Sequence, residues 1–278
     1  MTTGPIARGG RAATLREPRQ AATAALLVAL ALSAWAALAW WSAGPYARYV
    51  LHDGWASGAF VAELCRAIPA GGVVVPALLH AAAWVLMIAA MMLPTTLPLL
   101  EAFRRLTSAH PQRHRLLVAL VAGYLGVWLL FGLLVDAVDT ALHALVAANG
   151  WLLFNGWVVG VVVLALAGAY QFSRLKYACL DRCRSPLSFV MEHWHGANPW
   201  RDALRLGAHH GLFCIGCCWS LMVVMFVVGG GSIGWMLALA ALMAAEKNVA
   251  WGRHLAAPTG AALLLCAAAI ALRQLAGQ

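Results

Sequence analysis

The most reactive side chains of this sequence are concentrated in residues 207–222, GAHHGLFCIGCCWSLM. On a helix that advances about 100° per residue, one stripe of this run contains imidazole, thiol and thioether groups: His210, Cys214, Cys217, Cys218 and Met222. These ligands select soft ions such as Cu(I), and zinc competes for the thiolates and imidazoles. A single cysteine here is as readily explained as a small packing residue. The group as a whole favours a metal site.

Three further segments carry soft or ionisable groups, and they reach the same predicted end of the helices: Met91 with Met92, Cys179 with Cys183, and Glu246 with Lys247. An ionisable pair inside a predicted span indicates a functional group or a mutual ion pair, because unpaired charges are costly in lipid. We therefore expect these segments to converge on the 207–222 run. Cys179 and Cys183 would then add thiolates to those of Cys214 and Cys218 around one ion.

A second candidate metal site consists of Asp136, Asp139 and His143, whose spacing places them on one helix face. Carboxylates with imidazole form a harder ligand set, which suits Zn(II), Cu(II) or Fe(II). The Asp-x-x-x-His pair resembles, over two residues, the metal-binding subunit of particulate methane monooxygenase. The other interpretation is a helix end exposed to water. His80 and, on the expected outer loop, His52 are further residues that could complete such a site.

The elements that carry these groups are expected to be membrane helices. Hydrophobic residues make up 63% of the chain and charged residues 10%, and apolar stretches of about 20 residues recur. This predicts an all-α, polytopic membrane helix bundle of about seven transmembrane helices in one domain, residues 21–273, after a basic tail at 1–20. The expected spans are 21–43, 74–100, 116–142, 152–172, 208–229, 233–250 and 258–273.

The distribution of basic residues predicts the orientation of these spans. Lysine and arginine are concentrated in the tail and in loops 101–115 and 173–207, which the positive-inside rule places in the cytoplasm. The expected topology is N-in/C-out, with 44–73 as an outer loop and 173–207 as an inner loop, in a bacterial inner membrane. This asymmetry explains the net charge of +9, so we expect membrane lipid as a partner and no nucleic acid.

Five segments also carry a resemblance: AMMLPTTLPLL, GYLGVW, AGAYQFSRLKYACLDRCRSPLSFV, HHGLFCIGCCWSLM and AAEKNVAWGRHL. In this order they resemble a bacterial family described as predicted metal-binding integral membrane proteins, a domain of unknown function. The resemblance covers roughly residues 80–272, and its most specific part is the Cys-x-Gly-Cys-Cys-Trp motif at 214–219. It implies a membrane metal protein, with motif positions at Met91, Met92, Cys179, Cys183, Cys214, Cys217, Cys218, Glu246 and Lys247. Ser173-Arg174 departs from the Thr-Pro expected at the start of the inner loop.

Three classes of function fit these patterns. The first is copper handling or delivery through the Cys/His/Met cluster at the inner leaflet, with zinc or iron as alternative metals. The second is a copper- or iron-dependent membrane oxidase or monooxygenase, or a subunit of one, using the Asp/His site. The third is a structural membrane partner whose cysteines only pack. A soluble or membrane partner protein fits each class. No phosphate loop or Ser-His-Asp arrangement supports nucleotide-driven pumping or hydrolysis.

Overall fold

A computed structural model describes residues 16–43, 74–228 and 233–277, and these residues form helices and turns without a β-strand. The expected all-α fold is therefore confirmed for this part of the chain, whereas residues 1–15 of the basic tail and the outer loop 44–73 lie outside it. The helices are α2 (Arg16–Ser42), α4 (Val74–Met91), η2 (Pro94–Thr96), α5 (Leu97–Leu106), α6 (Arg113–Ala148), α7 (Gly150–Phe154), α8 (Trp157–Tyr170), α9 (Arg174–Arg184), α10 (Pro186–His193), α11 (Pro199–Val228), α12 (Ile233–Asn248), η3 (Gly252–Leu255) and α13 (Ala256–Ala276).

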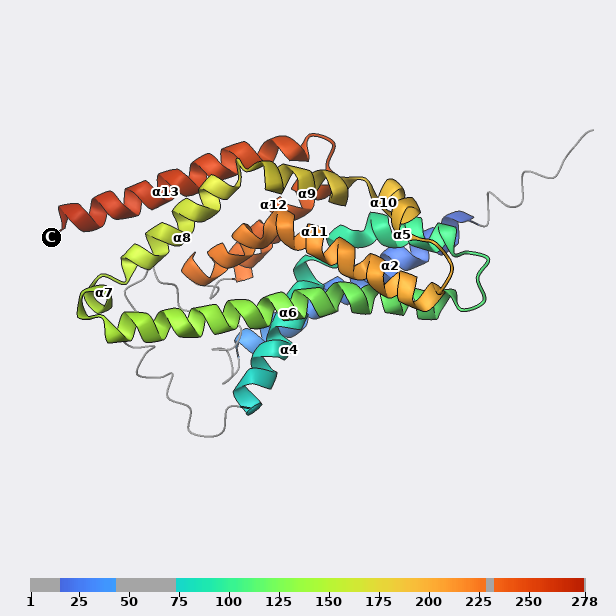
Figure 1. Cartoon of the computed structure of the whole chain (residues 1–278), viewed down its shortest axis with the longest axis horizontal. Helices are drawn as coiled ribbons and strands as arrows, with labels where there is room; N and C mark the ends of the chain where they lie inside the picture. The colour runs from blue at the N-terminus through green and yellow to red at the C-terminus, as the bar shows by residue number, and fades with distance from the viewer. Residues whose placement is uncertain (1–15, 44–73, 229–232, 278) are drawn as a thin grey trace, which may run out of the picture.

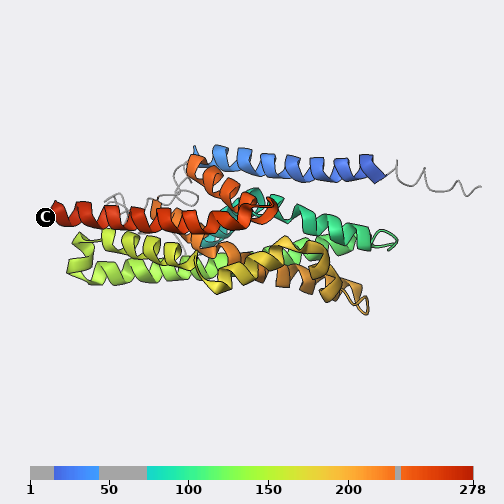
Figure 2. The ribbon, with the colours of Figure 1, turned by 90° about the horizontal axis from the view of Figure 1, so that it is seen from above.

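Three helical segments in the described residues are long and apolar enough to cross a membrane: Arg113–Ala148, Pro199–Met225 and Gly252–Ala276. Two bent helix pairs raise this number to five if each pair makes one crossing. The first pair is α4 followed by η2–α5, and the second is α8 followed by α9. The topology of seven spans and its orientation therefore stay predictions. Figure 2 shows α2 along one edge of the bundle, where it packs against α4.

Helix α11 lies at the centre of the arrangement and packs along α6 (Figure 1). Glycines let the two backbones approach closely: a Cβ on Gly207 would collide with the carbonyl of Leu120, and a Cβ on Gly123 with the carbonyl of Leu204. Small residues at such crossings are typical of helices packed in membranes. This packing fixes the axis of α11, the helix that carries the cysteine motif.

Two breaks in the helices bring side chains toward α11. The helix axis turns by 46° between α4 and η2–α5, where Pro94 lacks the N–H group that a continuous helix needs. It turns by 62° between α8 and α9, and Ser173 caps the new helix by accepting a hydrogen bond from the backbone N–H of Lys176 at 3.1 Å. Each break redirects the chain within a few residues.

The segment 173–207, expected as a loop, is largely helical: it forms α9, α10 and the first turns of α11. The helix starts have local causes, because Ser173 caps α9 and Pro186 occupies the first turn of α10, where its missing N–H is tolerated. As a result α11 begins at Pro199, so Cys214 lies about 22 Å along its axis at 1.5 Å per residue. The cysteine motif therefore lies in the middle of this helix.

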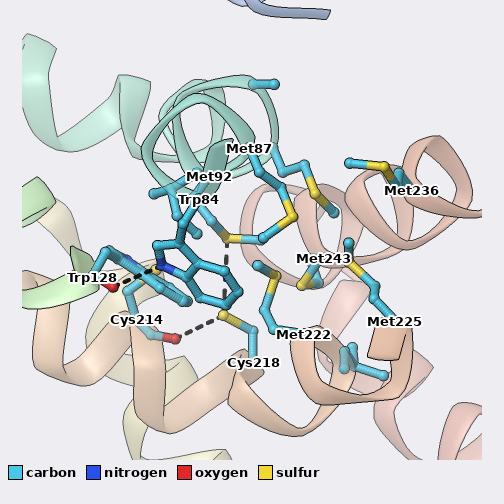
Figure 3. Close-up of a cluster of buried hydrophobic side chains, with 14 of the residues drawn as sticks. Trp84, Met87, Met92, Trp128, Cys214, Cys218, Met222, Met225, Met236 and Met243 are labelled. Carbon is cyan, nitrogen blue, oxygen red and sulfur yellow. Dashed lines mark hydrogen bonds between the residues drawn. The ribbon is translucent and has the colours of Figure 1, made fainter. Parts of the chain in front are cut away.

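The main core cluster is rich in sulfur. It contains seven of the nine methionines of the chain together with four buried cysteines: Met87, Met91, Met92, Met222, Met225, Met236, Met243, Cys179, Cys214, Cys217 and Cys218. Figure 3 shows many of these sulfur atoms facing one another, beside the indole rings of Trp84 and Trp128. The Trp84 ring N–H donates a hydrogen bond to the Trp128 carbonyl at 2.9 Å and ties α4 to α6.

Candidate metal centre

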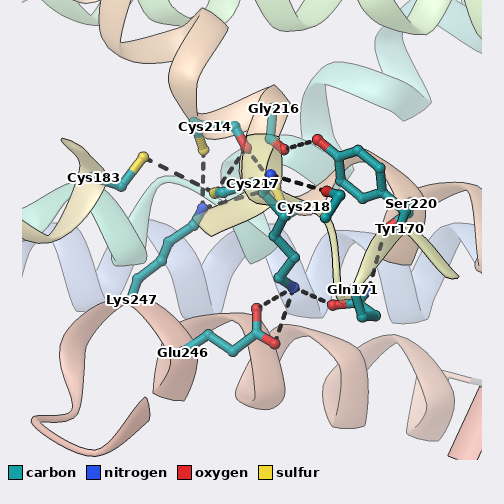
Figure 4. A network of polar contacts seen from close by, with 12 residues as sticks. Tyr170, Gln171, Cys183, Cys214, Gly216, Cys217, Cys218, Ser220, Glu246 and Lys247 are labelled. Atoms are coloured by element: carbon teal, nitrogen blue, oxygen red, sulfur yellow. Dashed lines mark hydrogen bonds and ion pairs between the residues drawn. The ribbon is translucent and has the colours of Figure 1, made fainter. Parts of the chain in front are cut away.

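Cys214 is the cysteine with the most polar surroundings in this core, and its side chain is almost fully buried. Its Sγ lies 2.9 Å from the ammonium nitrogen of Lys247 on α12 and 3.1 Å from the hydroxyl oxygen of Tyr124 on α6. Figure 4 shows Lys247 extending from α12 toward the sulfur. An ammonium group is a natural counter-ion for a thiolate. The geometry therefore favours Cys214 as the anionic sulfur of the cluster.

The thiols of Cys217 and Cys218 are oriented by the helix itself. Both donate to the carbonyl oxygen of Cys214, with Sγ–O distances of 3.1 Å and 2.9 Å respectively. Such bonds to a carbonyl three or four residues earlier are typical of short polar side chains inside helices. They gather the three sulfur atoms of the motif on one side of α11.

Helix α9 brings two further thiols to the same side of α11. The Sγ atoms of Cys183 and Cys217 lie 4.0 Å apart. Cys179 packs directly over Gly216, because a Cβ on this glycine would lie only 2.5 Å from the Cys179 Sγ. The glycine of the Cys-x-Gly-Cys-Cys motif thus provides the space into which α9 places its cysteine.

The thioether of Met92 reaches the cluster from the break between α4 and η2. Its Sδ lies 3.9 Å from the Cys218 Sγ and 3.6 Å from the Lys247 ammonium nitrogen. The Met92 side chain therefore contacts both α11 and α12. Thiols and a thioether from three separate helical segments therefore lie together.

A second network, of buried polar side chains, lies next to these sulfur atoms and is drawn in Figure 4. The Lys176 ammonium group on α9 lies 2.9 Å and 3.1 Å from the two carboxylate oxygens of Glu246 and also donates to the side-chain oxygen of Gln171. Gln171 in turn donates to the hydroxyl of Ser220 on α11 at 3.1 Å. The network joins α9, α11 and α12, so it fixes the helix that carries Lys247.

Arg184 completes the attachment of α9 to α12. Its guanidinium group donates to the carbonyl oxygen of Glu246, in the last turn of α12, and to that of Ala250, two residues after the helix ends. The last carbonyls of a helix lack partners within it, and a cation at a helix C-terminus is favoured by the helix dipole. The end of α12 is therefore held directly beside the thiols of α9.

His210, one turn before Cys214 on α11, is buried in a different environment. Its ring lies 6.0 Å from that of Tyr124 and 5.4 Å from that of Phe189, measured between ring centroids. Its Nδ1 is buried and makes no hydrogen bond within the described part of the protein. His210 and Cys214 are thus one turn apart on α11, as expected, but the His210 imidazole is packed among aromatic rings.

The residues singled out from the sequence fall into two groups. In contact with one another are Met92, Cys183, Cys214, Cys217, Cys218 and Lys247, while Met91, Cys179 and Met222 are buried in the same core. Among the described residues, no three His, Cys, Asp or Glu side chains already have the geometry of a metal site. Four thiolates surrounding one ion, as expected from the sequence, therefore remain a prediction that needs side chains to rotate.

Two polar residues around the cysteines were not assigned from the sequence: Tyr124 and Gln171. Tyr124 lies in the GYLGVW segment, and Gln171 lies in the segment AGAYQFSRLKYACLDRCRSPLSFV. Their position within the segments that resemble the metal-binding family was the available signal. Glu246 pairs with Lys176 and not with Lys247, so the mutual ion pair considered for these neighbours does not form.

The residues of the second candidate site form two separate pairs. The His143 Nδ1 lies 3.3 Å from a carboxylate oxygen of Asp139 and 2.8 Å from its carbonyl oxygen. His80 on α4 lies 3.4 Å from Asp136, a carboxylate that is 42% exposed. The structure thus brings His80 to this face, but the described residues hold no group of three ligands here.

A helical chain that buries thiols, a thioether and their counter-ion in one core has the donor set of a protein that handles a soft metal. The chain belongs to the PpoB2 family, described as a copper chaperone, because the model of this family matches residues 81–270. A search of curated proteins and a search of solved structures gave no match. Membership in this family relates the chain to copper handling. We therefore ask whether the sulfur ligands of the cluster suit copper.

Proposed function

We propose that this protein is a membrane-embedded copper chaperone that holds Cu(I) on the cysteines of α11 and passes it to an acceptor protein. The observation that carries the proposal is the meeting of thiols from α9 and α11 with the Met92 thioether at one buried place. The surrounding helices bury these groups in an apolar core. The apolar helices and the distribution of charge support a location in a bacterial inner membrane, with the site facing the cytoplasmic half.

The methionines support Cu(I) over zinc as the cargo. Thiolates bind both ions, but thioethers are soft ligands that favour Cu(I). Seven of the nine methionines gather in the core that contains the cysteines. A site that selected zinc would be expected to use cysteine and histidine without this sulfur-rich surrounding.

The same ligands support delivery over catalysis. Oxygen chemistry needs a metal with a vacant position that a substrate can reach, usually held by histidine and carboxylate. The cluster is buried and rich in thiols, and its side chains come from separate helical segments, which suits exchange of ligands with a partner. The Asp/His face offers a harder set, but its four side chains stand in two pairs.

The proposal is tested by the metal content of protein purified without chelators in a bacterial membrane host supplied with copper. Replacing Cys214, Cys217 and Cys218 together with serine should remove most of the bound copper. Two variants serve as controls and should retain it: Cys266→Ser, which changes an exposed cysteine on α13, and a triple alanine variant of Asp136, Asp139 and His143. Copper that stays with the serine variant, or leaves with the Asp/His variant, would refute the proposal.

A further inference from the structure

The Lys247 ammonium group lies among soft metal ligands. Its nitrogen is 2.9 Å from the Cys214 Sγ, 3.6 Å from the Met92 Sδ and 3.9 Å from the Cys218 Sγ. The hydroxyl oxygen of Thr95 completes this surrounding at 3.4 Å. Lys247 is only 7% exposed. A cation thus already sits between the sulfur atoms that we propose as copper ligands.

This placement is not explained by an ordinary ion pair. The adjacent carboxylate, Glu246, is bound by Lys176. Within the described residues Lys247 contacts sulfur and hydroxyl groups and forms no salt bridge with a carboxylate. Burying an ammonium group is costly without a partner of opposite charge. The Cys214 sulfur is the group placed to act as that partner.

A metal ion bound by the same sulfur atoms would need the space that the ammonium nitrogen occupies. Metal–thiolate distances are about 2.3 Å, judged from zinc, which is shorter than the nitrogen–sulfur distances around Lys247. An ion that bridges Cys214 and Cys218 from this side would therefore lie against the nitrogen. Two positive charges at such a separation in an apolar core repel each other strongly. The ammonium group and the ion exclude each other.

We propose that the Lys247 ammonium group and Cu(I) occupy the same position among Cys214, Cys218 and Met92 in turn. This inference rests on the proposed copper function. As copper arrives, the Lys247 side chain withdraws from the sulfur atoms and the Cys218 thiol loses its proton to solvent. As copper leaves for the acceptor, Cys218 takes up a proton again, and the ammonium group returns and neutralises the Cys214 thiolate. Release then avoids an uncompensated charge in the core, so Lys247 assists the transfer.

The chain provides an internal control for a direct test, because it has only two lysines, Lys176 and Lys247. Protein labelled with ¹³C in lysine gives side-chain methylene signals for these two residues alone, and the Lys247→Gln variant assigns them. During a Cu(I) titration under anaerobic conditions, the Lys247 signal should shift in proportion to bound copper. The Lys176 signal, held by Glu246, should stay. A Lys247 signal that is unmoved in copper-loaded protein overturns the inference.

The rate of copper release gives a second test. Copper-loaded wild type and Lys247→Gln are mixed with an excess of a coloured Cu(I) chelator, and the transfer is followed by absorbance. Loss of the returning cation should slow the transfer about tenfold, the factor that corresponds to 1.4 kcal/mol. Lys247→Arg retains the charge and should stay closer to wild type. If Lys247 only stabilised bound copper as a counter-ion, Lys247→Gln would release copper faster, and this outcome overturns the inference.

The two proposals fail in different ways. Wild-type protein that takes up no Cu(I) would overturn the proposed function and this inference with it. Wild-type protein that takes up Cu(I) while the Lys247 signal and the release rate of Lys247→Gln remain unchanged would overturn the exchange alone. Folding of the variant is checked by the Lys176 signal, since this residue reports the packing of α9 on α12.

Discussion

The sulfur atoms of Cys183 and Cys217 lie 4.0 Å apart, although these residues are 34 positions apart in the sequence. One belongs to α9, which follows a 62° bend, and the other to α11. A metal ion that bridges these thiols would therefore join two helices that the chain connects only through α10. Copper held by the cysteines of α11 would stabilise the attachment of α9 to α11 where Cys183 joins the ligands.

Met92→Leu is expected to lower the affinity for Cu(I) about tenfold or more, because it replaces a soft ligand by an aliphatic side chain of similar size. Affinity is measured by competition with a Cu(I) chelator of known strength. Zinc affinity should change little, since zinc does not favour thioethers. Met191→Leu, at an exposed position of α10, is the matched control. Equal loss in both variants would contradict a role for Met92 as a ligand.

Gly216→Ala is expected to destabilise the protein by about 1–3 kcal/mol, as overpacking of a core does. The new methyl group would lie 2.5 Å from the Cys179 Sγ, so either the Cys179 side chain must rotate or α9 must move away from α11, and copper retention should fall. Thermal unfolding in detergent measures the first effect and metal analysis the second. Gly126→Ala on α6, where a Cβ meets nothing within 4 Å, should leave copper unchanged and stability equal or slightly higher.

The buried ion pair of Lys176 and Glu246 leads to a prediction on stability. Replacing one partner with leucine leaves the other charge buried and should cost about 3–5 kcal/mol. Replacing both partners together should recover a large part of this loss, because no unpaired charge remains. Unfolding of the two single variants and the double variant forms a cycle that measures the coupling. Additive losses in the double variant would show that the pair does not stabilise the fold.

The sequence was sufficient to identify the segments that meet, because their residue types are unusual in apolar helices. Residues such as Cys214, Met92 and Lys247 stand apart in helices that are made mostly of alanine, leucine and valine. The periodicity of about 3.6 residues also placed the cysteines of α11 on one side. These features are local, so one sequence is enough to read them.

The actual partners depended on geometry that a sequence does not contain. Neighbouring residues on a helix are separated by about 100°, so Glu246 and Lys247 face different sides of α12. Which groups they meet is decided by α9, whose direction follows from the 62° bend after α8. Lys176 therefore forms an ion pair with the Glu246 carboxylate, and Lys247 contacts the Cys214 sulfur instead.

The short helices between 173 and 207 were missed for a related reason. Their apolar periodicity is weak over one to three turns, and they are held by caps and by packing, as shown by Phe189, which lies fully buried against α11. A helix of this length is marginal by itself. Its formation depends on the neighbours it packs against, and these are distant in the sequence.

Copper retention is expected to fall as the pH is lowered. The thiols of Cys217 and Cys218 donate hydrogen bonds to the Cys214 carbonyl, so both carry a proton that Cu(I) must replace. Binding therefore releases protons, and a higher proton concentration shifts the equilibrium toward the free ion. Titration with Cu(I) in weakly buffered solution measures the protons released. Cys217→Ser should release fewer than wild type, and equal release would show that this thiol is not a ligand.

The seven-span topology is open to a test that depends on α12. This helix has 16 residues, so at 1.5 Å per residue it is about 24 Å long, shorter than the roughly 30 Å of a bilayer core. If α6, α8, α11, α12 and α13 each cross the membrane, the turn before α6 and the C-terminus lie on opposite sides. If α12 does not cross, they lie on the same side. The sidedness of two reporters therefore decides between the two arrangements.

We expect a reporter inserted after Ala109, which is exposed in the turn between α5 and α6, to be cytoplasmic. A reporter fused after Gln278 is expected to be extracytoplasmic. Paired fusions of alkaline phosphatase, active outside, and green fluorescent protein, fluorescent inside, measure each position independently. Arg104, Arg105 and Arg113 flank the turn, so the positive-inside rule favours its retention in the cytoplasm. Two cytoplasmic reporters would reduce the crossings by one, and a reversed pattern would move the thiol cluster toward the outer face.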